Sequence, residues 1–335
     1  MSTYGLLNQI LIMYSKDKGI VLISILLIVL LLSSVAVLFG NKYFLSLKRA
    51  QYIEFQSVSL NIFRNIESLA KDKIDKELRF NKEKLTKNNP LISEPMAFNL
   101  NGAEIIGKIT DSGNCFNINS IVTLDGEQYV ENKKTTAAFR KILSLNEIDN
   151  NIIEEVIDQT IDWIDKDANP RAFGLEDYYY SGPLHSPREY TGMRLMVSIE
   201  ELKSIPAVKR IDWNIFKNYF CAIPKLDELS LNINTLDLED AYLLSSIFSN
   251  LTIKDAEYIL DNIPKSGFDD LNNFIGSFPD LDLKLAYGKI KVSSNIFEVN
   301  SEMSFNEFIS SSKSIIIYED NNNNGFIISR IYNGI

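Results

Sequence analysis

The fold is decided near the amino terminus, where residues 20–39 read IVLISILLIVLLLSSVAVLF. No residue between Lys18 and Lys42 carries a charge. Twenty residues of helix span about 30 Å, the thickness of the hydrocarbon core of a bilayer. The stretch is longer than the apolar core of most cleaved secretory signals. It therefore predicts a membrane-spanning helix, and both a permanent anchor and a segment with a processed leader remain open.

The helical pattern continues beyond the apolar stretch. From Asn41 to Asn89 the sequence contains neither Gly nor Pro. Apolar residues recur in this region at a spacing of three or four, which marks one face of an amphipathic helix. We therefore expect residues 41–89 to continue the membrane helix on the water side and to carry a globular domain.

The composition argues against several classes of function. The chain has a net charge of −10, which argues against nucleic-acid binding because phosphate contacts need clustered Lys and Arg. Its one histidine, His185, excludes a His-rich metal site, and no G-x-S-x-G turn is present for a hydrolase triad. Cys115 and Cys221 can pair in an oxidising compartment or remain two buried thiols. No enzymatic activity is predicted.

Changes of periodicity divide the rest of the chain. Asn88-Asn89-Pro90 breaks the long helix, and residues 90–116 are expected to form the first part of the sheet. Residues 103–109 and 115–118 predict a small β-hairpin across a turn at residues 111–114, with a loop as the alternative. Residues 117–285 are helical in character, whereas residues 286–335 return to strands with a turn at Asp320–Gly325. The predicted class is α+β: a long amino-terminal helix and a small antiparallel sheet, interrupted by a large helical insertion.

A short motif occurs twice in the insertion. Residues 116–120 read FNINS and residues 231–235 read LNINT. Asparagine favours helix N-caps and turns, so each copy is expected to begin a helical hairpin. Residues 198–208 and 258–268 are similar to helix-hairpin-helix turns, but their charge favours packing over binding to nucleic acid.

One segment has the spacing of a calcium-binding loop. Counting Asp165 as position 1 places Asp167 at 3, Asn169 at 5 and Glu176 at 12, with the carbonyl of Arg171 at 7. Calcium prefers six to eight oxygen ligands, and alternating short carboxylates let one loop supply several of them. The segment therefore predicts a structural Ca²⁺ site.

Pro170 departs from this pattern. It stands at position 6, where an EF-hand requires Gly for a sharp turn. We therefore expect a rearranged ligand set, with Asp177 and Asp162 as further candidates. The alternative is an acidic, solvated junction between a helix and a loop.

With these residues in view, the chain resembles the minor pseudopilin K family of type II secretion systems. The block over residues 162–180 is the most specific, because it combines D-W-I-D-x-D-x-x-P with G-x-E-D-x-Y-Y. Supporting blocks extend over nearly the full length: Lys18-Gly19-Ile20, Phe116-Asn117-Ile118-Asn119, Ser198-x-Glu200-Glu201-Leu202 and Asn232-Ile233-Asn234-Thr235.

The resemblance implies a processed membrane protein. Residues 1–19 would be a prepilin leader that prepilin peptidase removes after Gly19, and the new amine of Ile20 would be methylated. Residues 20–40 would then span the inner membrane once, with the carboxy-terminal domain in the periplasm, before assembly with the major pseudopilin. The family forms a tip complex with minor pseudopilins I and J and binds calcium in its insertion.

Ser24 is position 5 counted from Ile20, where most pilins and pseudopilins carry Glu. A charged group in lipid is unfavourable by about 2.5–3.5 kcal/mol and is retained where a partner amine meets it. A subunit at the tip has no subunit ahead of it, so Ser24 fits a terminal position. The alternative is a serine that is simply tolerated because its hydroxyl bonds a backbone carbonyl.

We therefore expect a structural protein that nucleates or caps a pseudopilus for export across the outer membrane. The alternative function is a periplasmic calcium-binding sensor or binding protein held by an uncleaved single-pass anchor. A membrane-tethered receptor for nucleic acid is a further alternative that the net charge of −10 disfavours.

Overall fold

The protein is described from a computed structural model that covers residues 4–80, 84–183, 186–226, 228–319 and 325–334. For residues 4–19 only the helical backbone is described. The chain forms two compact units, Met1–Asn61 and Ile62–Ile335. Helix α1, Tyr4–Phe80, begins in the first unit and ends in the second.

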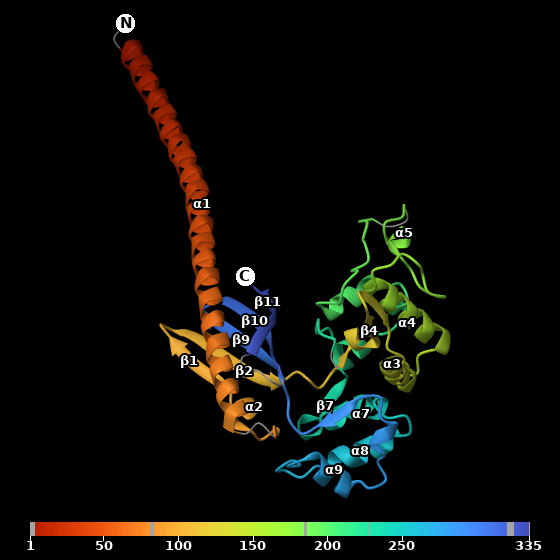
Figure 1. Cartoon of the computed structure of the whole chain (residues 1–335). Helices are drawn as coiled ribbons and strands as arrows, with labels where there is room; N and C mark the ends of the chain where they lie inside the picture. Colours follow the sequence, from red (N-terminus) through yellow and green to blue (C-terminus); the bar gives the residue numbers. More distant parts are fainter. Residues whose placement is uncertain (1–3, 81–83, 184–185, 227, 320–324, 335) are drawn as a thin grey trace. The chain divides into compact units, whose positions relative to one another are not determined.

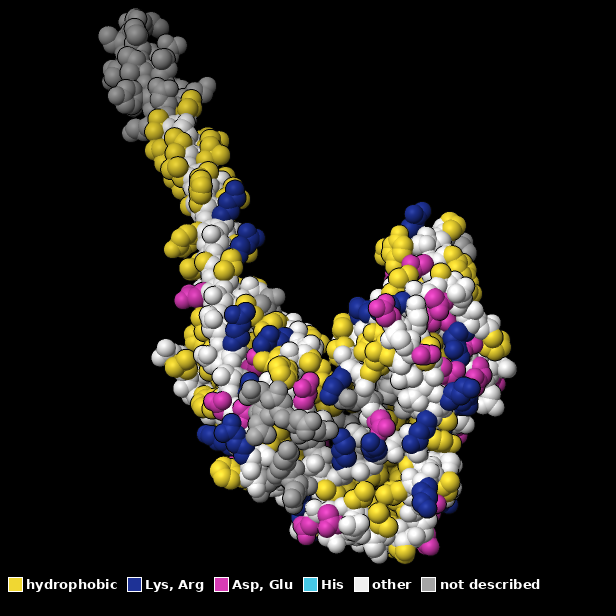
Figure 2. Space-filling view, in the orientation of Figure 1, with side chains coloured by type: hydrophobic (Ala, Val, Ile, Leu, Met, Phe, Trp, Pro, Cys, Tyr) yellow, Lys and Arg dark blue, Asp and Glu magenta, His cyan; other side chains and the backbone are white. Residues whose placement is uncertain are grey.

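The first unit is the amino-terminal part of α1. The helix contains an 18-residue window with a mean hydropathy of 3.2, none of which is buried within the chain. Hydrophobic side chains are visible along this part of the helix in Figure 2. Its length and composition suit one membrane crossing, as the sequence predicts.

The second unit contains a five-stranded antiparallel sheet in the order β1-β2-β9-β10-β11 (Figure 1). The hairpin predicted across residues 111–114 is wrong, because β2 pairs with β1 and β9, whereas residues 116–117 pair with β6, Phe220–Cys221. The chain instead leaves this sheet after β2 for the insertion and returns to it at β9. The turn predicted at Asp320–Gly325 falls mostly outside the described residues, although the strands that flank it do pair. The strands are β1 Met96–Leu100, β2 Ala103–Asp111, β9 Ile296–Phe305, β10 Phe308–Tyr318 and β11 Gly325–Asn333.

The last turns of α1 pack against this sheet. Phe63, Ile66, Ala70 and Ile74 are buried and recur at helical spacing. A Cβ atom on Gly107 of β2 would lie 2.6 Å from Ile66, so glycine permits the close approach of helix and sheet. This helix-on-sheet arrangement confirms the predicted α+β class.

Polar contacts reinforce the same packing. Arg330 of β11 donates two hydrogen bonds of 2.8 Å to the carboxylate of Glu67. The Tyr318 hydroxyl of β10 donates to Asp75 at 2.6 Å. Helix α1 ends at Phe80, before the predicted boundary at 89, and Leu85 already donates its N–H to the carbonyl of Val292.

The insertion surrounds one hydrophobic core that extends from Phe116 to Ile290. The β4–β5 hairpin was not predicted, although its Asp125-Gly126 turn is a hairpin signal, with Gly126 at φ +62°. The short helix α2, Pro90–Ser93, precedes the sheet. The elements of the insertion are β3 Phe116–Asn117, β4 Val122–Asp125, β5 Gln128–Glu131, α3 Lys133–Leu145, α4 Asn150–Ile164, α5 Asp177–Tyr180, α6 Trp213–Tyr219, β6 Phe220–Cys221, β7 Ser230–Asn232, α7 Ala241–Ser246, α8 Ile253–Asp261, α9 Leu271–Ser277 and β8 Lys289–Lys291.

The two copies of the repeated motif make the same pattern of hydrogen bonds. Each copy lies on a short parallel strand pair, β3 with β6 and β7 with β8, followed by a 3₁₀ turn rather than directly by a helical hairpin. The Asn119 side chain accepts a hydrogen bond from the Met196 N–H at 2.7 Å and donates to the Met196 carbonyl at 2.9 Å. Asn234 makes the same pair of bonds with Phe268, at 2.7 and 2.9 Å. The motif therefore reflects a repeated structural unit.

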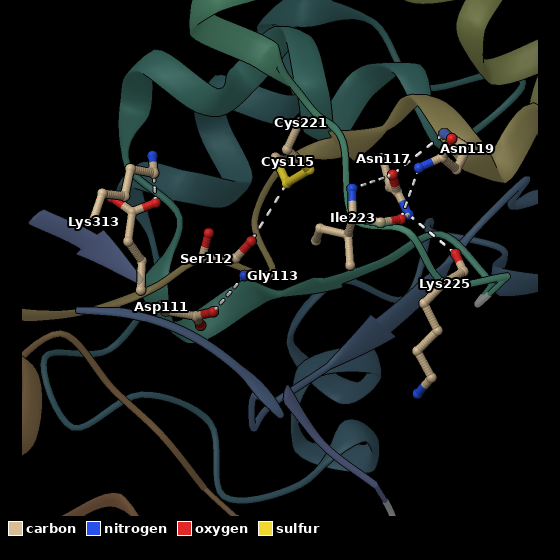
Figure 3. The surroundings of a disulfide bond; sticks show 11 residues. Asp111, Ser112, Gly113, Cys115, Asn117, Asn119, Cys221, Ile223, Lys225 and Lys313 are labelled. Carbon is tan, nitrogen blue, oxygen red and sulfur yellow. Dashed lines mark hydrogen bonds and ion pairs between the residues drawn. A yellow bond between two sulfur atoms is a disulfide. The ribbon is translucent and has the colours of Figure 1, made fainter. Parts of the chain in front are cut away.

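Cys115 and Cys221 form a disulfide (Figure 3). The bond joins the residue before β3 to the end of β6, across a sequence separation of 106. The first half of the insertion is therefore closed covalently at the point where its chain enters and leaves.

Candidate metal centre

Three carboxylates meet where helix α4 ends. Asp162 lies in the last turn of α4, Asp165 is its C-cap residue, and Glu176 precedes the short helix α5. One oxygen from each lies within 4.8 Å of the others, and all three residues are buried. The end of α4 and the loop that follows it therefore bring three negative groups into one small volume.

Several of these oxygens have no hydrogen-bond donor. Asp165 Oδ1 and both oxygens of Glu176 are buried without a partner among the described residues. Glu176 as a whole is only 1 % exposed. A buried carboxylate without a donor or a counter-charge is strongly unfavourable. The unsatisfied oxygens are therefore suited to a positive group placed between them.

Burial raises the pKa of each carboxyl group in the cluster. The pKa is raised to about 6 for Asp162 and to about 7 for Asp165 and Glu176. Repulsion from the neighbouring acidic groups adds to the effect of burial. A divalent cation between the three groups would reverse this balance and favour their ionised forms.

The loop after α4 is held close to Asp162. The Arg171 N–H donates to the Asp162 carboxylate at 3.2 Å. A Cβ atom on Gly174 would lie 1.8 Å from Asp162 Oδ2, so this position requires glycine. The Arg171 guanidinium donates to Asp158 of α4 and Glu131 of β5, both at 2.7 Å. These contacts fix the orientation of the cluster.

Only two of the side chains predicted from the calcium-loop spacing lie in this cluster. Asp165 and Glu176 belong to the cluster, together with Asp162, which the sequence offered as a further candidate. Asp167 and Asn169 are exposed and lie outside it, and Asp167 instead accepts a hydrogen bond from the Asn169 N–H at 2.8 Å.

Asp177 has a different role. Its Oδ1 accepts hydrogen bonds from the N–H and the hydroxyl of Thr191, both at 2.7 Å. Pro170 accounts for the departure from an EF-hand loop, because its fixed φ prevents the tight turn at position 6. Sequence reasoning missed the anchoring role of Arg171 and Asp158, although Asp158 and Asp162 share one face of α4 at the i, i+4 spacing.

The residues of the cluster fit a hard cation. Carboxylate oxygens are the ligands that Ca²⁺ and Mg²⁺ prefer, and the donor set contains neither sulfur nor nitrogen. Two carboxylates with unsatisfied oxygens leave room for direct coordination. The arrangement can therefore hold a structural divalent ion between the end of α4 and the start of α5.

The assembly residues predicted near the amino terminus lie within α1. The Ser24 hydroxyl donates to the carbonyl of Ile20 at 2.9 Å, the bond expected of a serine in an apolar helix. Gly19 precedes Ile20 without a break in the helix. His185 lies outside the described residues.

These features define a class: a pilin-type α+β protein with one apolar amino-terminal helix and a helical insertion that contains an acidic cluster. Two family models described as "Type II secretion system (T2SS), protein K" match residues 114–225 and 231–291. Together the two matches cover just over half of the chain. The chain belongs to the type II secretion system protein K family.

Individual relatives agree with this assignment. A type II secretion system protein K from Pectobacterium carotovorum is 34% identical over 188 residues, which are 53% of this chain and 55% of that protein. One from Aeromonas hydrophila is 29% identical over 215 residues, 60% of this chain and 62% of that protein. The matched region therefore spans little more than half the length of these relatives.

The fold also has a solved counterpart. The structure of the GspK–GspI–GspJ complex from the type 2 secretion system of enterotoxigenic Escherichia coli contains a chain that superposes with a TM-score of 0.72. The superposition covers 85% of this chain and 99% of that chain, at 21% sequence identity. At this identity the match establishes the fold.

Proposed function

We propose that this protein is a minor pseudopilin that occupies the tip of a type II secretion pseudopilus and nucleates or caps its assembly for protein export. The observation that carries the proposal is the combination, in one chain, of a pilin-type helix-on-sheet unit with a protein K insertion. The pilin-type helix supplies a means of assembly, and the bulky insertion would block the addition of a subunit above it. No catalytic activity is part of the proposal.

The proposed partners are minor pseudopilins I and J, and then the major pseudopilin. The solved complex with GspI and GspJ supports the choice of the first two. Coexpression of the full chain with I and J from the same system, followed by native mass spectrometry in detergent, tests it. We expect one copy of each subunit in the complex. A chain that remains alone in the presence of both would contradict the proposal.

The proposed location before assembly is the inner membrane, with one crossing and the carboxy-terminal domain in the periplasm. The apolar window of α1 supports the single crossing. The Cys115–Cys221 disulfide supports the periplasm, because disulfides persist in oxidising compartments. Prepilin peptidase would remove residues 1–19 at this stage, and the amine of Ile20 would then be methylated.

The proposed cofactor is one structural Ca²⁺ at Asp162, Asp165 and Glu176. The unsatisfied buried oxygens of Asp165 and Glu176 support it. The ion would neutralise the cluster and join the end of α4 to the loop before α5. A ligand that binds only the folded state adds about 2.7 kcal/mol of stability at one hundred times its Kd.

A further inference from the structure

A cavity of about 360 Å³ opens where the helical insertion joins the sheet. Three stretches of the chain contribute lining residues. The first runs from the end of β2 to β3, the second from β6 to the start of β7, and the third from β8 to the start of β9. The described lining residues are Gly113, Cys115, Asn117, Ile223, Lys225, Leu226, Glu228, Leu229, Ser230, Lys289, Lys291, Asn295 and Ile296. Ligand pockets in proteins have volumes of about 300–1,000 Å³. The cavity is therefore large enough to accept part of another molecule.

Two of the walls are fixed to each other. The Asn117 side chain accepts from the Ile223 N–H and donates to the Ile223 carbonyl, both at 3.0 Å, and also donates to the Lys225 carbonyl at 3.4 Å (Figure 3). The Cys115–Cys221 disulfide joins the same two segments. A preformed wall loses little conformational freedom when a ligand binds.

The charge of the lining is opposite to that of the chain. The chain has a net charge of −10, yet the described lining contains three lysines, Lys225, Lys289 and Lys291, and one acidic residue, Glu228. Lys289 and Lys291 alternate with buried Ile290 on β8, so both project to the same side of the strand. The cavity therefore presents a positive field within an acidic protein.

The site already stabilises one carboxylate. Glu228 forms an ion pair with Lys289. The hydrogen bond from Lys289 lowers the pKa of Glu228, and the charges of Lys289, Lys134 and Lys291 lower it further. The lysines of the lining therefore already favour one ionised carboxylate, although its side chain is largely exposed.

Apolar side chains complete the lining. Ile223, Leu226, Leu229 and Ile296 lie in the same walls as the lysines. Lysines beside aliphatic side chains match a chain in which acidic residues alternate with apolar ones.

We propose that this cavity binds an extended acidic peptide segment of a protein partner. Carboxylates of the segment would lie near Lys289 and Lys291, and an apolar side chain would enter among the aliphatic residues of the walls. Binding would compete with the Glu228–Lys289 ion pair. The inference is independent of the proposed pseudopilin function.

The test uses the full chain in detergent micelles and a short fluorescein-labelled peptide of alternating glutamate and leucine. Fluorescence polarisation measures the affinity. We expect Lys291→Gln to weaken binding about fivefold and Glu228→Gln to strengthen it about threefold, because the latter removes a competing carboxylate. Lys254→Gln, at an exposed position on α8, is the matched control and should change nothing.

The opposite directions of the two variants separate the proposal from a general loss of folding. Saturable binding with this pattern of affinities supports it. Equal affinities for the wild type, Lys291→Gln and Glu228→Gln would overturn it, as would the absence of saturable binding. Displacement of the peptide by inorganic phosphate at the same concentration would also overturn it, because a simple anion site would then explain the data.

Discussion

At the residue scale, Glu176 is the side chain on which the metal proposal depends most. It is buried, and neither carboxylate oxygen has a donor among the described residues. Its neighbours in the cluster, Asp162 and Asp165, are also acidic. Replacing its charge therefore has opposite consequences for the calcium-free and the calcium-loaded protein.

We expect Glu176→Gln to raise the melting temperature of the calcium-free protein and to abolish the increase that Ca²⁺ produces in the wild type. The first effect follows from removal of a buried charge, and the second from loss of a ligand. Differential scanning fluorimetry in calcium and in chelator measures both. Asp167→Asn is the matched control, because Asp167 is exposed and lies outside the cluster. Loss of the calcium-dependent shift in Asp167→Asn would instead favour the EF-hand ligand set, and survival of the shift in Glu176→Gln would contradict Glu176 as a ligand.

The raised pKa values of the cluster give a pH prediction. Burial raises the pKa of Asp162 to about 6 and that of Asp165 and Glu176 to about 7, from ordinary values near 4. Between these limits the folded calcium-free protein binds more protons than the unfolded chain, so this contribution to the unfolding free energy decreases as pH rises. Urea unfolding in chelator should show the decrease from about pH 4 to about pH 7.

Saturating calcium should remove this decrease, because the ion binds the ionised carboxylates. The triple variant Asp162→Asn, Asp165→Asn, Glu176→Gln provides the control and should lack the contribution of the cluster. An equal pH dependence in the wild type and the triple variant would show that these groups do not titrate as described.

The sequence predicts part of this site. The i, i+2 spacing of acidic residues after α4 locates the loop, and Glu176 is found at the expected distance along the chain. Spacing could not predict that Asp167 points to solvent or that Asp177 bonds Thr191, because both depend on how the loop packs against α4. Pro170 was the one local signal that the EF-hand geometry would change.

At the scale of elements, the conformation of the loop between α4 and α5 depends on the close approach of Gly174 to Asp162. A Cβ atom on Gly174 would lie 1.8 Å from Asp162 Oδ2, so Gly174→Ala must displace that carboxylate. We expect calcium affinity to fall about tenfold, as for other changes that misorient a metal ligand. Isothermal titration calorimetry measures the affinity. Gly276→Ala on α9 has open space around its Cβ and should leave affinity unchanged; equal values for the two variants would contradict the assigned geometry.

The disulfide links the chain at the start of β3 to the end of β6. It closes a loop whose ends are 106 residues apart, and cross-links over loops of this length stabilise proteins by about 4–5 kcal/mol in the chain-entropy description. The double variant Cys115→Ser, Cys221→Ser should therefore unfold at a lower urea concentration than the oxidised wild type. The reduced wild type is the control and should behave like the variant. Identical midpoints for the oxidised and reduced wild type would contradict a stabilising role.

Elements differ in how far the sequence predicts them. Helix α1 and the alternating strands β2 and β9 follow from long periodic stretches of one type. The pairs β3–β6 and β7–β8 are only two or three residues long, and their partners are distant in the chain. Such non-local contacts leave no periodic signal, although the repeated Asn-Ile-Asn motif marked where both pairs begin.

At the scale of the whole molecule, one helix serves two environments. The apolar window of α1 is exposed within the chain, whereas the last turns of the same helix are buried against the sheet. In the proposed function the apolar part lies first in a bilayer and then among other helices of the pseudopilus. Ser24 bonds its own helix and carries no charge, which suits a subunit with no neighbour above it.

The mature amino terminus tests this account most directly. The full chain, produced in a host with an active prepilin peptidase and purified from the inner membrane, can be measured by intact mass and by terminal peptide sequencing. We predict a chain that begins at Ile20 with a methylated amine, and Gly19→Ala should block the cleavage. A mature chain that retains Gly19 and the residues before it in the presence of active peptidase would contradict the assignment as a pseudopilin.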